Sequence, residues 1–267
     1  MRFDPPLVEA RVLARRKRFL ADVVFPDGTE AVAHCANSGR MTACLVPGGK
    51  VLLSPSTNPK RKLKWSWEVA YAGADGTVPV LVHTGRPNGI VVEAIRQDRI
   101  AGLTGYATLR TEVKYDENSR CDIVLEDPSK PACFVEVKNV TLWRGGRTGA
   151  FPDAVSARGR KHLEALTRVV QSGRRAVLLY LVSRGDIDVV RPADDIDPAY
   201  GRALREAASA GVELLAVRAQ ITPEEVTVTQ PVDIDLSWRS STPDRRPMPS
   251  SQPPENGATA ERTLQPG

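Results

Sequence analysis

Phe134-Val135-Glu136-Val137-Lys138 is the stretch that decides the fold of the second half of this 267-residue chain. Side chains alternate between the two faces of a strand, so Glu136 and Lys138 share one face while Val135 and Val137 share the other. Burying a carboxylate and an amine in an apolar strand is costly unless the charges are paired or used. The stretch therefore predicts a strand that carries a functional site on one face.

A second acid comes from the strand expected just before this one. Cys121–Leu125 is apolar apart from Asp122, and the turn-rich stretch Asp127–Pro131 follows it. A hairpin with this turn at its tip sets Asp122 roughly opposite Glu136, on the same face as Lys138. Two acids and one base in a cluster form the arrangement that a magnesium-dependent phosphodiesterase needs.

The chemistry of this cluster follows from what phosphodiester hydrolysis requires, namely stabilised phosphoryl oxygens and a hydroxide beside them. Asp122 and Glu136 are the predicted catalytic ligands of Mg²⁺ or Mn²⁺. Lys138 is the third predicted catalytic residue and would orient the attacking water or offset the developing charge. A structural ion pair between Glu136 and Lys138 is the alternative; the strand that carries Asp122 and the βαβ unit that follows favour the metal site.

Glu93 is a candidate for a further metal ligand. It lies near the inward face of a helix predicted over about residues 89–97, with Asn88 as its N-cap. Pairing with Arg96 or Gln97 on the surface is an equally supported interpretation of this residue.

Positive charge gathers in the first third of the chain. The whole chain carries a net charge of +5, yet residues 1–90 hold 13 Lys and Arg against 7 Asp and Glu, a net +6. Such an excess predicts a module that binds a polyanion, attached to a nearly neutral domain. We therefore expect DNA, with RNA as a further possibility, to be the partner.

Cations and aromatic side chains interleave in residues 58–67, which hold four Lys or Arg and two tryptophans. Cations follow backbone phosphates, and an aromatic ring stacks on a base for about 1–3 kcal/mol per base. Trp67 is expected in the core, whereas for Trp65 core packing and base stacking stay open. The predicted nucleic-acid contacts are Arg18, Asn37, Arg40, Lys60, Arg61, Lys62, Lys64, Trp65, Arg158, Lys161 and His162. For the last three, a solvated helix face explains the charges equally well.

Turn and periodicity patterns divide the chain into three parts. Short strands broken by turns predict an OB-fold-like, nucleic-acid-binding β-barrel over residues 1–84. Residues 85–237 follow the order α-β-β-β-α-β-α-β, which predicts a mixed α/β sheet with parallel crossovers. Helices are expected over about residues 89–97, 153–171 and 198–210, the last capped by Asp197. Few apolar anchors are expected beyond Ala219, and residues 238–267 are predicted to be a disordered tail.

Composition narrows the class of protein further. The hydrophobic fraction of 41% and the charged fraction of 26% are those of an ordinary globular protein. No apolar run has the length of a signal peptide or a bilayer span, so we expect a cytoplasmic protein without a membrane partner. The 4 cysteines show no C-x-x-C spacing, which predicts neither a zinc site nor a disulfide framework.

Eight spaced stretches, in order along residues 3–235, resemble the sugar fermentation stimulation protein A family of bacteria and archaea. They are Phe3–Leu7, Arg18–Val23, His34–Met41, Asn58–Lys62, Asn118–Asp122, Val135–Leu142, Phe151–Val155 and Lys161–Leu163. Ser38 stands where Thr is expected and Arg160 where Gln is usual. Of these departures, only Arg160 is at a position expected to face substrate.

The resemblance implies an N-terminal OB-fold and a C-terminal, restriction-endonuclease-like domain of the PD-(D/E)xK nuclease type. In that superfamily pattern, the central-strand acid falls on Asp122, the Glu-x-Lys motif on Glu136 and Lys138, and the first-helix acid on Glu93. The resemblance also implies DNA binding and an effect on sugar (maltose) utilisation.

Two functions from different classes fit these observations. The first is a metal-dependent nuclease, supported by the complete acid-acid-lysine set. The second is a non-catalytic DNA-binding regulator of sugar (maltose) metabolism genes that uses the same cleft without turnover. An adaptor with a purely structural ion pair fits the modest net charge but not the clustering of the charges.

Overall fold

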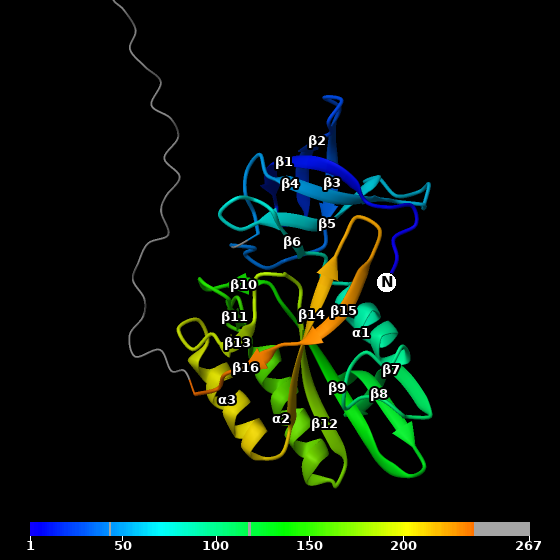
Figure 1. The fold of residues 1–267 in the computed structure, drawn as a ribbon, viewed down its shortest axis with the longest axis vertical. Helices are drawn as coiled ribbons and strands as arrows, with labels where there is room; N and C mark the ends of the chain where they lie inside the picture. The colour runs from blue at the N-terminus through cyan, green and yellow to red at the C-terminus, as the bar shows by residue number, and fades with distance from the viewer. Residues whose placement is uncertain (43, 117–118, 238–267) are drawn as a thin grey trace, which may run out of the picture.

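The first six strands of the computed structural model, which describes residues 1–42, 44–116 and 119–237, form a small barrel (Figure 1). They are β1 (Val8–Arg16), β2 (Leu20–Val24), β3 (Glu30–Cys35), β4 (Lys50–Pro55), β5 (Trp65–Ala72) and β6 (Val78–Leu81). Neighbouring strands pair in the order β3-β2-β1-β4-β5-β6, and the parallel pairing of β3 with β5 closes five of them into a barrel. The predicted OB-type barrel is confirmed.

The inward-pointing apolar residues explain why these strands close into a barrel. Alternate residues of each strand point inward, as in β1, where Ala10 and Val12 are buried between exposed neighbours. Trp67 is fully buried, and its indole Nε1 donates a hydrogen bond to the Val69 carbonyl at 2.9 Å. The expectation that Trp67 belongs to the core is confirmed.

The second part of the chain is a mixed α/β domain. Its helices are α1 (Pro87–Arg96), α2 (Ala157–Gln171) and α3 (Pro198–Ser209). Its strands are β7 (Thr108–Asp116), β8 (Ser119–Asp127), β9 (Lys130–Val140), β10 (Leu142–Trp143), β11 (Thr148–Phe151), β12 (Arg175–Val182), β13 (Val189–Pro192), β14 (Glu213–Ile221), β15 (Val226–Pro231) and β16 (Asp233–Ile234). The main sheet has the order β15-β14-β12-β9-β8-β7, with β9, β12 and β14 parallel. This confirms the predicted mixed α/β sheet.

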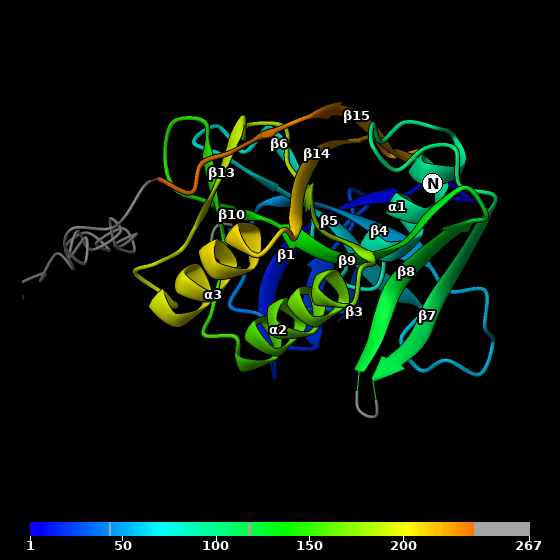
Figure 2. The ribbon, with the colours of Figure 1, turned by 90° about the horizontal axis from the view of Figure 1, so that it is seen from below.

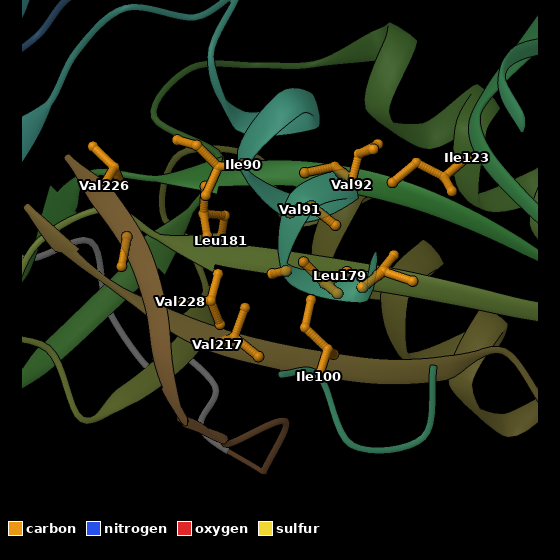
Figure 3. Packing of buried hydrophobic residues seen from close by; sticks show 14 of the residues in the cluster. Ile90, Val91, Val92, Ile100, Ile123, Leu179, Leu181, Val217, Val226 and Val228 are labelled. Atoms are coloured by element: carbon orange, nitrogen blue, oxygen red, sulfur yellow. The ribbon is translucent and has the colours of Figure 1, made fainter. Parts of the chain in front are cut away.

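Helices cover both faces of this sheet, as Figure 2 shows. The apolar side of α1 packs on one face; Figure 3 shows Ile90 and Val91 meeting Leu179 and Leu181 of β12 and Val226 of β15. On the other face, α2 and α3 bury Leu163, Leu166 and Leu204 with residues of β8, β9 and β12. The strand β9 is therefore buried on both faces, and its Glu136 and Lys138 side chains lie between the sheet and α2.

The barrel and the α/β domain share a buried apolar cluster at their interface. Leu52, Val69 and Leu81 of the barrel belong to the same buried cluster as Ile90 of α1. Residues 1–7 precede β1 but pair with the loop between β14 and β15: the backbone N–H of Phe3 donates to the Glu224 carbonyl at 2.8 Å, and that of Leu7 to the Pro223 carbonyl at 2.8 Å. The boundary predicted between residues 84 and 85 thus runs through a packed interface.

A buried ion pair crosses the same interface. Glu68 of β5 is fully buried, and its carboxylate accepts two hydrogen bonds from the guanidinium of Arg86, Nε at 2.9 Å and Nη2 at 2.5 Å. The Ser54 hydroxyl donates a third at 2.7 Å. Because Arg86 immediately precedes α1, this pair fixes the barrel to the start of the first helix.

Several local expectations were wrong. Asn88 does not cap α1, which begins at Pro87 after Arg86 and has no side-chain cap. The second helix begins at Ala157 rather than near residue 153, because the Ser156 hydroxyl accepts the Gly159 N–H. The Asp197 cap of α3 is confirmed, since its side chain accepts the Tyr200 N–H.

The segment beyond Ala219 was also predicted wrongly. Strand β14 continues to Ile221, and β15 and β16 follow; Val226 and Val228 are buried apolar anchors of β15. The predicted disordered tail, residues 238–267, lies outside the described residues. None of the helices in the described part of the chain is long and apolar enough to cross a membrane.

Candidate active site

The strand β9 brings Glu136 and Lys138 to the face covered by α2. The Lys138 ammonium donates to Oε1 of Glu136 at 2.6 Å. His162, in the second turn of α2, contacts the same oxygen through Nδ1 and lies 3.1 Å from Lys138 Nζ. The Glu136 side chain is only 3% exposed, so this carboxylate is held in a nearly dry environment by two basic groups.

Arg158, a further neighbour of His162, bears on which ring nitrogen of His162 carries the proton. Arg158 Nε donates to His162 Nε2 at 3.3 Å, and an arginine N–H can only donate. The tautomer in which Nε2 accepts from Arg158 carries its proton on Nδ1, from which it can be donated to Glu136. Arg158, His162 and Glu136 thus form a relay of contacts that runs from the surface of α2 to the buried strand.

Asp122 comes to the site where β8 and β9 separate. Their backbone pairing begins at Ile123 with Val135; beyond it, the Val137 N–H donates to Oδ2 of Asp122 at 2.8 Å instead of to a strand carbonyl. The Asn88 side chain donates to the other oxygen, Oδ1, at 2.9 Å. The carboxylate is thereby fixed between the first turn of α1 and the middle of β9.

The two carboxylates respond differently to burial. Burial and the repulsion by Glu136 raise the pKa of Asp122 above its ordinary value. Burial also opposes ionisation of Glu136, but the hydrogen bond from His162 and the charge of Lys138 outweigh it and lower the pKa of Glu136. The hydrogen bonds from Val137 and Asn88 and the charge of Lys138 offset the rise in the pKa of Asp122 only in part.

This donor set fits a magnesium-type cation. Within the described residues, no group of three or more His, Cys, Asp and Glu side chains is arranged to hold a metal by itself. Mg²⁺ does not need such a cage, since it commonly takes one or two carboxylates and completes its shell with water and substrate phosphate. Asp122 and Glu136 would supply those two carboxylates, and the repulsion between them is what a cation would relieve.

Glu93 has other partners. Its carboxylate lies 2.9 Å from the amino group of Met1 and accepts a hydrogen bond from Gln97 Nε2 at 3.2 Å. Five residues separate Glu93 from Asn88, which on a helix of 3.6 residues per turn places it about 140° away from the side that faces Asp122. The structure therefore does not bring Glu93 to the acidic cluster, and the interpretation as a surface pair with Gln97 describes its geometry better.

The predicted contacts on the barrel lie mainly at its surface. The side chains of Arg18, Arg40, Lys60, Lys62 and Lys64 are exposed, and Arg61 is half-buried. Asn37 is partly buried and donates to the Val82 carbonyl at 2.9 Å. Trp65 is half-buried, with its ring centroid 5.0 Å from that of Phe25, so it packs partly into the barrel.

The charged residues of helix α2 differ in their surroundings. Arg158 and Lys161 are exposed, as expected for groups that meet a polyanion. Arg160 instead pairs with the buried Asp197 at 3.0 Å, joining the starts of α2 and α3. The departure from the family pattern at Arg160 therefore has a structural partner rather than a substrate-facing position, contrary to expectation.

Sequence reasoning missed the roles of two residues. Asn88 was assigned to a helix cap, but it holds Asp122. His162 was assigned only to nucleic-acid contact, but it touches both Glu136 and Lys138. The spacing of His162 within its helix carries no indication of this contact, because the contact depends on how α2 crosses β9.

The fold and the site define a two-part protein. A closed OB-type barrel is joined to a mixed α/β domain that gathers two carboxylates and a lysine between its sheet and helices. Residues 13–82 match the family model described as the SfsA N-terminal OB domain, and residues 85–225 match the one described as the sugar fermentation stimulation protein RE domain. The chain belongs to the sugar fermentation stimulation protein family.

Relatives from several bacteria support this assignment. The sugar fermentation stimulation protein homolog of Paramagnetospirillum magneticum is 50% identical over 239 residues, which cover 90% of this chain and 100% of the relative. The homolog of Geobacter sulfurreducens is 52% identical over 225 residues, 84% of this chain and 94% of the relative. The structure of Pyrococcus furiosus SfsA in complex with Ca²⁺ has the same fold, with a TM-score of 0.75, 24% identity, and coverage of 86% of this chain and 96% of that one.

Proposed function

We propose that this protein is a DNA-binding, metal-dependent phosphodiesterase of the PD-(D/E)xK nuclease type, which uses Mg²⁺ or Mn²⁺. The observation that carries the proposal is the cluster of the buried Glu136 with the partly buried Asp122 and Lys138, in a chain whose barrel has a basic surface. A purely structural ion pair would not need Asp122, whose ionisation in this place is opposed by burial and by Glu136. The Ca²⁺ in the related archaeal structure further supports a divalent cation in this family.

Each residue of the cluster has a distinct part in this proposal. A divalent cation held by Asp122 and Glu136 would stabilise the phosphoryl oxygens and acidify a bound water. Lys138, which Glu136 keeps in place, presents a positive charge to the phosphate or the attacking water. His162 donates its Nδ1 proton to Glu136 and so keeps that carboxylate ionised and oriented. The Asn88 side-chain amide donates to Asp122 and so orients that carboxylate.

Cleavage is expected only in the presence of a divalent metal. Labelled single-stranded, double-stranded and branched DNA incubated with the protein should yield shorter products with Mg²⁺ or Mn²⁺ and none with EDTA, because two carboxylates alone cannot offset the charge that develops at phosphorus. Gel electrophoresis of the products measures this. The same yield with EDTA, or no product with any substrate and metal, would contradict the proposal.

A non-catalytic DNA-binding regulator of sugar (maltose) metabolism genes is the second candidate, favoured by the exposed cations of the barrel. Both functions require phosphate contacts, so binding in EDTA should weaken as salt rises. For three or four contacts to duplex DNA we expect a loss of about 40-fold to 150-fold between about 50 and about 200 mM salt.

Two variants test whether the cations of the barrel make these phosphate contacts. Changing Lys60, Arg61 and Lys62 together to Ala should reduce the slope of log affinity against log salt by about 2–3. Arg96→Ala, which removes an exposed cation from the last turn of α1, should leave the slope unchanged. An affinity that does not change with salt concentration would favour an adaptor that binds no nucleic acid. Salt-dependent binding without cleavage would favour the regulator.

A further inference from the structure

Two sequence stretches that the phosphodiester site leaves unexplained meet in space. The loop Asn37–Gly39 of the barrel faces the segment Phe151–Ser156 of the α/β domain, and together they line a cavity of about 390 Å³. The approach is close: a Cβ added at Gly39 would lie 2.8 Å from Oδ2 of Asp153. The two segments therefore approach each other closely, and the cavity depends on both parts of the chain.

The cavity adjoins the proposed catalytic site. Asn139, which lines it, directly follows Lys138 on β9, with its side chain on the opposite face of the strand. Ser156, also in the lining, caps the helix that carries Arg158 and His162. The cavity and the proposed catalytic site are thus built on neighbouring positions of β9 and of the start of α2.

The loop that forms the barrel side is held rigidly. The Asn37 side chain donates to the Val82 carbonyl at 2.9 Å and accepts the Gly39 N–H at 2.8 Å. The Arg15 guanidinium donates to the carbonyls of Asn37 at 2.5 Å and Gly39 at 3.0 Å. Since these groups are already paired, the cavity is preformed and its opening needs no rearrangement of the loop.

The chemistry of the lining selects the kind of ligand. Leu142 and Phe151 give an apolar wall, with the Phe151 ring fixed against Tyr180 and Tyr200 at centroid distances of 5.7 and 5.3 Å. Asp153 is exposed, and among the described residues it has no hydrogen bond or ion pair. A free carboxylate repels phosphate but accepts hydrogen bonds from amino groups.

We propose that this cavity binds an unpaired nucleobase that bears an exocyclic amino group, next to the phosphodiester at the catalytic site. The base would lie against Leu142 and Phe151 and donate its amino hydrogens to Asp153. The exposed cations Arg40 and Arg158 follow the lining residues Gly39 and Ser156 closely in sequence and suit the flanking phosphates. The inference rests on the proposed function, because it requires a nucleic acid at the site.

The test measures binding in EDTA, so that it does not depend on cleavage. Fluorescence anisotropy compares duplexes with one extrahelical adenine, one extrahelical thymine or one extrahelical abasic residue at the same place. The wild-type protein should bind the adenine duplex at least about fivefold more tightly than the abasic one, as stacking of one base predicts. It should also prefer adenine to thymine, whose ring carries no amino group.

The variant Asp153→Ala removes the acceptor from an exposed position. It should bring the adenine and thymine affinities to within about twofold of each other, while both still exceed the abasic affinity because the apolar wall is intact. Glu164→Ala removes an exposed carboxylate from α2 and should keep the wild-type preference. Ratios between ligands cancel the general gain in affinity that follows from losing a negative charge.

The outcomes separate this inference from the proposed function. Equal, salt-dependent binding of all three duplexes by the wild type would overturn the base-binding cavity and leave the phosphodiester site standing. A preference for adenine that survives in Asp153→Ala would overturn the role of Asp153. Absence of binding to any duplex would overturn the proposed function itself, and the cavity inference with it.

Discussion

Asp122→Ala is expected to lower metal-dependent cleavage by about 10³-fold or more. The variant removes one of two metal ligands, and losing electrostatic stabilisation at phosphorus costs at least as much as losing an oxyanion donor, about 10²–10³-fold. Initial rates on labelled DNA at fixed Mg²⁺ measure the loss.

The isosteric variant Asp122→Asn supplies the control for folding. Burial and Glu136 raise the pKa of Asp122, so its ionised form is less favourable in the folded protein than in the unfolded chain. At pH values above the ordinary carboxyl pKa, removing that charge should leave the melting temperature equal to or higher than that of the wild type. Activity should be lost. Full activity in both variants would remove Asp122 from the catalytic site. A collapse in melting temperature would instead make Asp122 a structural residue.

Glu68→Ala is expected to destabilise the protein by about 3–5 kcal/mol. The variant leaves the Arg86 guanidinium at the interface without its carboxylate and also strips the Ser54 hydroxyl of its acceptor. Because the pair joins β5 to the start of α1, both parts of the chain should lose stability together. Urea unfolding followed by tryptophan fluorescence and by circular dichroism measures the change.

An exposed pair provides the comparison for Glu68. Glu9 contacts Lys50 at 2.7 Å at the surface of the barrel, so Glu9→Ala should cost about 1 kcal/mol or less. A Glu68→Ala loss no larger than that of Glu9→Ala would mean that Arg86 finds water or another partner and that the buried pair does not hold the interface.

The parts of the fold that were predictable depend on local patterns. The alternation around Glu136 predicts β9 and its two faces, and the turn-rich stretch after Asp122 predicts the hairpin of β8 and β9. Short strands between turn residues likewise predict the barrel. These patterns are set by neighbours in sequence, and the residue types decide them without reference to the rest of the molecule.

The parts that were missed depend on distant contacts. Asn88 and Asp153 are residue types that commonly cap helices, yet one binds Asp122 and the other faces the barrel loop at Gly39. Short strands such as β10 and β13 hold two to four residues and form only because a partner from elsewhere lies beside them. Residue spacing cannot reveal such partners. The same holds for His162, whose contact with Glu136 requires the crossing of α2 over β9.

The pairing of residues 1–7 with the β14–β15 loop has a consequence for synthesis on the ribosome. Phe3 and Leu7 are made first, but their hydrogen-bonding partners at positions 223 and 224 emerge only after more than 200 further residues. The apolar side chains of this leading segment stay without their final packing partners until then, which is the situation in which nascent chains recruit chaperones. Barrel closure can precede release, but burial of the leading segment waits for β14 and β15.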